Sequence, residues 1–241
     1  MKLIALLGAI AFAGVMTASN ASANAGAYLF GYTYPPFDTG VHELILNGGA
    51  TVLTATNTGW YDFTGSHLAS NPDYIVGDCS IGTCGGVGGY NDFFVFDLSG
   101  VKGPITSAQL SMFNPSIYPG YSGKPSSTYT NFDVSTAIGT LIADASGATG
   151  IYNDLGTGTA FGSTSVSAAD NGTQVIVNLN AAALASLTAG EGGQWAIGGT
   201  LGTFTPPGVP EPATWGMMLM GFLGLGAVLR RGRRTAATAT A

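Results

Sequence analysis

The stretch Gln174-Val175-Ile176-Val177-Asn178-Leu179 decides the fold class of this 241-residue chain. Val175, Val177 and Leu179 occupy every second position in it and therefore share one face. A period of two residues is typical of a strand that buries one face, because successive side chains of a strand point to opposite sides. Asp170-Asn171-Gly172 directly before it is a turn signal. We therefore expect a β-strand here that follows a tight turn.

Runs of the same kind recur along residues 24–204, with turn residues such as Asn47-Gly48-Gly49 between them. We expect strands at residues 27–32, 42–46, 51–55, 93–98, 108–113, 129–134, 140–143, 174–179 and 194–198. One helix is expected over Ala181–Thr188, with Asn180 as its N-cap and Gly190 ending it in a left-handed conformation. Many short strands with little helix predict an all-β fold class, a single β-sandwich or jelly-roll-like ectodomain over residues 24–204.

The charge of this segment limits its partners. Lys102 and Lys124 are its only basic residues, whereas all the acidic residues of the chain except Glu211 lie within residues 24–207. Nucleic acid and anionic membrane surfaces are poor partners for such an acidic surface, so we expect no nucleic acid as a partner; divalent cations or neutral glycans suit it better. The 38 glycines could also indicate disorder, but apolar groups and aromatic residues recur along the whole segment.

The N-terminus has the pattern of a secretory signal peptide. Met1-Lys2 is followed by the apolar run 3–15 and by the small residues Ala21-Ser22-Ala23. The run is short for a membrane span and ends before a cleavage triplet. We expect signal peptidase to remove residues 1–23. The alternative is an N-terminal anchor that is retained.

The C-terminus has three parts after a stiff Pro/Gly spacer at residues 205–208. Val209-Pro210-Glu211-Pro212 is followed by 17 uncharged residues, 213–229, and by the basic cluster 230–234, whereas the tail 235–241 carries no charge. The apolar run is just long enough for a single transmembrane helix, and the arginines would keep its end in the cytoplasm. Prolines fix an extended strip before the helix. An ordinary single-pass anchor is the alternative interpretation.

This order of elements resembles the PEP-CTERM sorting signal of Gram-negative bacteria. The resemblance covers residues 209–234, with Gly216 where alanine is common and a short tail after the arginines. It implies recognition by an exosortase-type membrane cysteine peptidase, an inner-membrane-tethered intermediate, and delivery to the cell surface or extracellular matrix, in association with exopolysaccharide. The recognition residues would be Pro210, Glu211, Pro212, Trp215, Arg230, Arg231, Arg233 and Arg234.

The ectodomain also resembles a type that recurs among such sorted proteins. The matching segments are residues 59–62, 73–77, 93–99, 153–156 and 196–199. This resemblance implies no biochemical activity.

Cys79 and Cys84 are the two cysteines of the chain. Export would place them in an oxidising compartment, so we expect a disulfide that closes a small loop. A metal site is less favoured because His42 and His67 are remote in sequence, and a catalytic thiol has no local signature.

Acidic residues around this loop are the candidates for a metal site, namely Asp73, Asp78, Asp92 and Asp97. Carboxylates gathered on loops could bind Ca²⁺, although their spacing matches no defined calcium loop. The alternative is that they are turn residues. No other cofactor is expected.

For a glycan we consider Tyr118 and Tyr121, on either side of Pro119-Gly120, because sugar faces pack on aromatic rings. The alternative is that these tyrosines only line loop edges. A carbohydrate- or calcium-binding module is thus a second hypothesis.

The sequence contains no nucleophile elbow, zinc-peptidase motif or phosphate loop. Glu43 and Glu191 are the only glutamates before the tail, and sequence does not show whether they face each other as a glycosidase would need. We therefore expect a protein that is not an enzyme, with a secreted hydrolase as the least favoured alternative.

Overall fold

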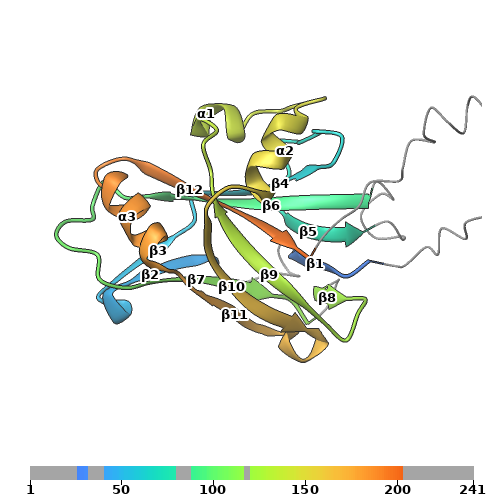
Figure 1. Cartoon of the computed structure of the whole chain (residues 1–241), viewed down its shortest axis with the longest axis horizontal. Coiled ribbons are helices and arrows are strands. Elements are labelled where there is room, and N and C mark those ends of the chain that lie inside the picture. The colour runs from blue at the N-terminus through green and yellow to red at the C-terminus, as the bar shows by residue number, and fades with distance from the viewer. Residues whose placement is uncertain (1–25, 32–40, 80–87, 117–119, 203–241) are drawn as a thin grey trace, which may run out of the picture.

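The computed structural model describes residues 26–31, 41–79, 88–116 and 120–202. Within them the chain is mostly β-strands in curled antiparallel sheets with few helices, which confirms the all-β class (Figure 1). The strands are β1 Tyr28–Gly31, β2 Glu43–Leu46, β3 Thr51–Thr54, β4 Asn57–Asp62, β5 Tyr74–Cys79, β6 Gly88–Asp97, β7 Ala108–Asn114, β8 Gly120–Ser122, β9 Ser126–Asp133, β10 Ala160–Ser167, β11 Thr173–Asn178 and β12 Gln194–Leu201. The helices are α1 Ile138–Leu141, α2 Thr149–Gly156 and α3 Ala181–Ala189, with 3-10 turns at Asn47–Gly49 and Ala168–Asp170.

Two sheets enclose the main core. The larger has the order β10-β9-β12-β6-β5-β1-β8, with β4 paired to β6, and the smaller has the order β11-β7-β2-β3. In β11, Val175 and Val177 are buried whereas Ile176 is 36% exposed, so the period of two residues in the sequence does mark a half-buried strand. The core draws side chains from both sheets, among them Leu44, Leu110 and Phe94.

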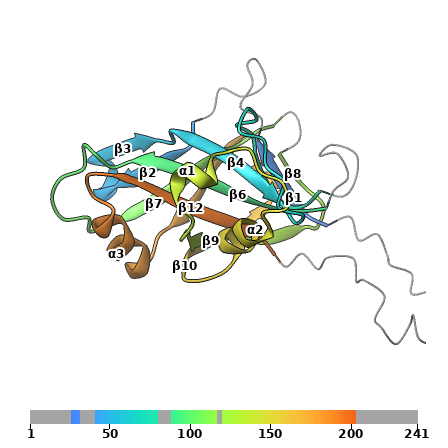
Figure 2. The same ribbon diagram turned by 90° about the horizontal axis from the view of Figure 1, so that it is seen from above.

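Strand β6 is buried on both faces, because both faces of the large sheet are covered around it. Phe94 and Phe96 belong to the main core. Phe93 and Val95 belong to a second apolar cluster on the outer face, together with Leu141 and Leu155 from α1 and α2. Figures 1 and 2 show these two helices over the strands of the large sheet.

The helix α3 packs at one end of the molecule and inserts Ala183 and Leu187 into the main core (Figure 1). Its predicted N-cap is confirmed, because the Asn180 side chain accepts hydrogen bonds from the backbone amides of Ala182 and Ala183. Gly190 ends the helix as predicted, but the predicted left-handed conformation is wrong, since Gly190 has φ −89° in the right-handed region.

The strand predicted at residues 140–143 is also wrong, because Ile138–Leu141 is the helix α1. The short apolar run carries no period that separates helix from strand. Its conformation is set by packing, since Leu141 is fully buried against the outer face of the large sheet.

Several predicted segments lie outside the described residues: the signal peptide 1–23, the spacer 205–208, the transmembrane helix 213–229, the basic cluster 230–234 and the tail 235–241. In the part of the chain that the structure describes, no helix is long and apolar enough to cross a membrane.

Candidate functional site

A hollow of about 480 Å³ opens beside α2 on the outer face of the large sheet. Strands β9 and β12, the helix α2 and β6 all contribute to its wall. Its lining residues are Asn91, Thr128, Thr130, Phe132, Tyr152, Asn153, Gly156, Thr157, Thr200 and Gly202. None of these side chains is a carboxylate, an amine, a guanidinium or an imidazole. The hollow is therefore suited to an uncharged polar ligand.

The strand period places the threonines of β9 in this wall. Thr128 and Thr130 are separated by Tyr129, which is fully buried in the main core. Thr130 lies directly opposite Thr200 of β12 in the antiparallel register. Paired residues of an antiparallel ladder share one face, so the two hydroxyl side chains stand next to each other.

Glycines allow α2 to lie close to the sheet. A Cβ atom on Gly198 would be 2.7 Å from the carbonyl oxygen of Leu155, and one on Gly156 would be 2.5 Å from Asn91 Nδ2. The Asn91 Nδ2 amide donates a hydrogen bond of 2.8 Å to the backbone carbonyl of Tyr152. These contacts fix the helix as one wall of the hollow.

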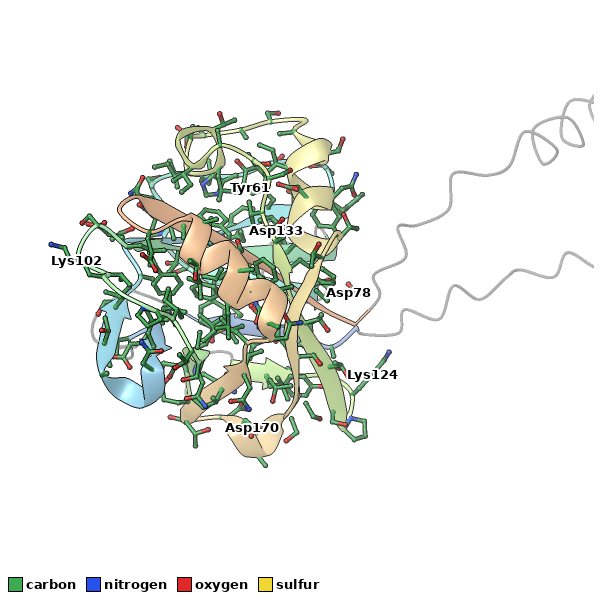
Figure 3. The ribbon with its side chains drawn as sticks, turned by 60° about the vertical axis from the view of Figure 1, so that its left-hand side comes forward. Tyr61, Asp78, Lys102, Lys124, Asp133 and Asp170 are labelled. Atoms are coloured by element: carbon green, nitrogen blue, oxygen red, sulfur yellow. The ribbon has the colours of Figure 1, made fainter. Side chains whose placement is uncertain are left out.

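Burial and, after it, two acidic residues act on the Tyr152 hydroxyl in the hollow. Burial raises the pKa of Tyr152 to about 12, with a further contribution from the charges of Asp62 and Asp78. The Tyr152 hydroxyl is therefore neutral at physiological pH and can donate a hydrogen bond. The only two lysines among the described residues, Lys102 and Lys124, point outward from the body in Figure 3.

A buried polar cluster lies on the inner face, directly behind this wall. The Tyr129 hydroxyl donates to Asp92 Oδ1 at 2.9 Å, and Asn131 Nδ2 donates to the Tyr129 oxygen at 3.0 Å and to the Gly198 carbonyl at 3.0 Å. Burial raises the pKa of Asp92 to about 8. At neutral pH this carboxyl is mostly protonated.

The structure does not assemble the predicted calcium site, since the described residues contain no group of three His, Cys, Asp or Glu that could hold a metal ion. Asp92 is fully buried in the inner face, whereas Asp97 is exposed at the end of β6 and accepts a hydrogen bond from the Ser99 amide. Asp73 is buried directly before β5, and Asp78 is half-buried within it. Five residues of strand, about 16 Å, separate Asp92 from Asp97.

The prediction of Tyr121 as a glycan platform is also wrong. Its side chain is only 3% exposed and packs in the main core, because β8 pairs with β1 at the edge of the large sheet. Its hydroxyl lies 2.9 Å from the Lys124 carbonyl and 2.9 Å from the Ser127 hydroxyl. Tyr118 lies outside the described residues.

The cysteines were predicted to bond to each other. Cys79 is buried at the end of β5 and takes part in a disulfide. Cys84 lies outside the described residues, so its pairing with Cys79 stays a prediction.

Sequence reasoning missed the residues of the hollow itself. Thr130 in the strand predicted at residues 129–134, and Thr128 just before it, were a signal for a polar face. Nothing in the sequence paired Thr130 with Thr200 or placed Tyr152 beside them.

The comparisons with known proteins identify the tail. The family model described as the PEP-CTERM protein-sorting motif matches residues 208–234. No curated protein and no solved structure matches the chain. The match includes the predicted recognition residues from Pro210 to Arg234, all of which lie outside the described residues.

The chain thus carries a sorting motif that follows an all-β ectodomain in the sequence. The motif supports a surface protein that is exported, sorted while anchored in the membrane, and processed by an exosortase, itself a membrane protein.

Proposed function

We propose that this protein is a non-catalytic surface or matrix protein of a Gram-negative bacterium that associates with exopolysaccharide after its tail has been processed. The match of the sorting motif to residues 208–234 carries this proposal. In the proposed path, signal peptidase cleaves after Ala23 and the helix 213–229 is a temporary anchor that presents Pro210-Glu211-Pro212 to the exosortase.

A non-catalytic role is supported by the side chains of the hollow. Its lining offers hydroxyls, amides and two aromatic rings, and its one titratable side chain, Tyr152, has a pKa near 12. A general acid or base works best with a pKa near the operating pH. The lining is thus composed for binding rather than for proton transfer.

A Glu211→Ala variant tests the sorting step, with Glu191→Ala in the ectodomain as its matched control. We expect the Glu211 variant to accumulate unprocessed in the inner membrane, while the control is processed like the native chain. Fractionation followed by intact mass measurement reports both cleavage points and shows whether the helix is retained. Normal processing of the Glu211 variant would mean that the tail is an ordinary anchor.

The association with exopolysaccharide has a separate test. In a strain that makes no exopolysaccharide, the processed protein should move from the cell-bound fraction into the medium. If its distribution did not change, the proposed association would be wrong even with sorting intact.

The second candidate function is a carbohydrate-binding module, which the uncharged hollow beside α2 favours. It differs from the first candidate because it requires a defined ligand site on the ectodomain.

A further inference from the structure

We propose that the hollow beside α2 and the strand surface next to it form one binding site for a neutral, hydroxyl-rich glycan chain. This inference rests on the second candidate function, a carbohydrate-binding module, and names its site. The strand surface, which we call the hydroxyl platform, consists of Thr128, Thr130, Ser163, Ser165 and Thr200.

The antiparallel register assembles the platform from three strands. Thr130 of β9 lies opposite Thr200 of β12 on one side and opposite Ser163 of β10 on the other. Thr128 lies opposite Ser165 in the next row. Neighbouring strands are about 4.8 Å apart and alternate residues of one strand about 6.7 Å apart. The five hydroxyls therefore form a compact two-row array that continues the floor of the hollow.

These hydroxyls are available to a ligand. Thr128, Ser163 and Ser165 are exposed, and Thr130 and Thr200 are half-buried. Among the described residues, none of the five side-chain hydroxyls has a hydrogen-bond partner. A hydroxyl can donate one hydrogen bond and accept others, which matches the donor and acceptor character of sugar hydroxyls.

Aromatic side chains complete the site. Phe132 lies in line with the threonines of β9, and Tyr152 projects from α2 into the same hollow. Both rings are half-buried, so each is held by the protein and still offers a surface. The apolar faces of sugar rings pack on such rings, whereas sugar hydroxyls need the polar floor. The combination fits a glycan better than an apolar ligand.

The charges select a neutral glycan over an anionic one. Acidic residues act on this wall, since the charges of Asp62 and Asp78 contribute, after burial, to the raised pKa of Tyr152. No lysine or arginine lines the hollow to pair with a carboxylate or sulfate. A polyuronate would be repelled at the site, whereas an uncharged polysaccharide would not.

Affinity electrophoresis of the full chain, in a detergent without a sugar headgroup, tests this proposal. The gels would contain dextran, mixed-linkage β-glucan or galactomannan as neutral polymers, and alginate as the anionic one. We expect retardation by at least one neutral polymer and none by alginate. Retardation by no neutral polymer, or a preference for alginate, would overturn the proposal.

Substitutions then locate the site. Thr130→Val and Thr200→Val keep the side-chain shape and remove one hydroxyl each, so each should weaken binding by about 3- to 10-fold, as the loss of one hydrogen bond does. Tyr152→Ala should weaken it by about 10-fold or more. Thr54→Val on β3 of the other sheet is the matched control and should bind like the native chain.

Circular dichroism would show whether Tyr152→Ala disturbs α2. If it does, the two valine variants alone test the position of the binding site. Unchanged binding in both valine variants, or an equal loss in the control, would overturn the site. Binding is measured on purified protein, so its failure leaves the sorting test with Glu211→Ala unaffected, and failure of the sorting test leaves the binding result unaffected.

Discussion

The Tyr129 hydroxyl donates a hydrogen bond to the Asp92 carboxyl group in a place where both side chains are fully buried, with 2.9 Å to Oδ1 and 3.2 Å to Oδ2. Burial raises the pKa of Asp92 to about 8, although this hydrogen bond acts in the opposite direction. Burial, followed by the charge of Asp92, raises the pKa of Tyr129 well above its ordinary value. The pair is therefore neutral at physiological pH.

Asp92 makes the stability of the fold fall as the pH rises from about 4 to about 8, because in this range its carboxyl is ionised only in the unfolded state. Its folded pKa lies above the unfolded value of 3.8, so its contribution is full below pH 3.8 and is lost as the pH rises through about 8. Asp92→Asn should remove this dependence and be more stable than the native chain at pH 9, by several kcal/mol. Urea unfolding at pH 5, 7 and 9 measures it.

Asp97→Asn is the control for that series, because Asp97 lies on the same strand but is exposed. It should lose stability between pH 5 and 9 as the native chain does. If Asp92→Asn also lost stability between pH 5 and 9 as the native chain does, the buried carboxyl would not be the cause.

Gly199 gives the Asp92 and Tyr129 pair its space. A Cβ atom at this position would overlap the Tyr129 hydroxyl and Asp92 Oδ1. Gly199→Ala should therefore lower the free energy of unfolding by about 1–3 kcal/mol, as overpacking does. Gly150→Ala in α2, where no atom lies within 4 Å, should be neutral or stabilising by up to about 1 kcal/mol. Thermal unfolding measures the stability of both variants. Equal changes of stability in the two would contradict this expectation.

His42 gives the opposite dependence at acid pH. It packs between Tyr74 and Phe94, with ring centroids 4.9 Å and 5.2 Å away, and neither ring nitrogen has a partner among the described residues. Burial lowers its pKa from 6.5 to about 4. Its contribution to stability is therefore present above pH 6.5 and is lost as the pH falls through about 4.

We expect the His42→Phe variant to unfold at a lower pH than the native chain, because its unfolded state has no imidazole to take up a proton at this position. His67, whose pKa burial also lowers but whose Nδ1 lies 2.8 Å from the Trp60 carbonyl, is the internal reference. NMR titration of the imidazole resonances reports both histidines. A His42 resonance that titrates near 6.5 would disprove the expected burial.

The sequence predicts those parts of the fold whose signal is local. The alternation around Val177 identifies a half-buried strand, and Asn180 caps α3 as its side chain chemistry suggests. The helices α1 and α2 are not predicted, because their conformation depends on packing. Leu141 and Leu155 are buried against a sheet whose strands lie in other parts of the sequence.

The candidate site is less predictable from the sequence, because the register of strand pairing brings its residues together. Thr130 joins Thr200 across 70 positions of sequence only when β9 and β12 pair. The sequence suggests Asp92 as a metal ligand, because an acidic residue near a loop is usually a solvated carboxylate. Its actual partner, Tyr129, is 37 positions away, and a buried, protonated carboxyl leaves no mark in composition.

Asp154 holds the helical wall of the hollow, and its removal should loosen that wall. Its carboxylate accepts hydrogen bonds from the amides and hydroxyls of Ser135 and Thr136, at 2.6 to 3.3 Å. Burial alone would raise the pKa of Asp154, but the hydrogen bonds outweigh burial, and the net shift of the pKa is downward. The stabilisation by the Asp154 carboxylate is therefore present above pH 3.8 and is lost as the pH falls below that value. Asp154→Asn should cost about 1–3 kcal/mol at pH 7 and speed hydrogen exchange in Thr149–Gly156, with a smaller cost at acid pH. The control is Asp133→Asn, because the Asp133 side chain has no hydrogen bond to another described residue. Equal hydrogen exchange in the two variants would show that Asp154 does not hold the helix.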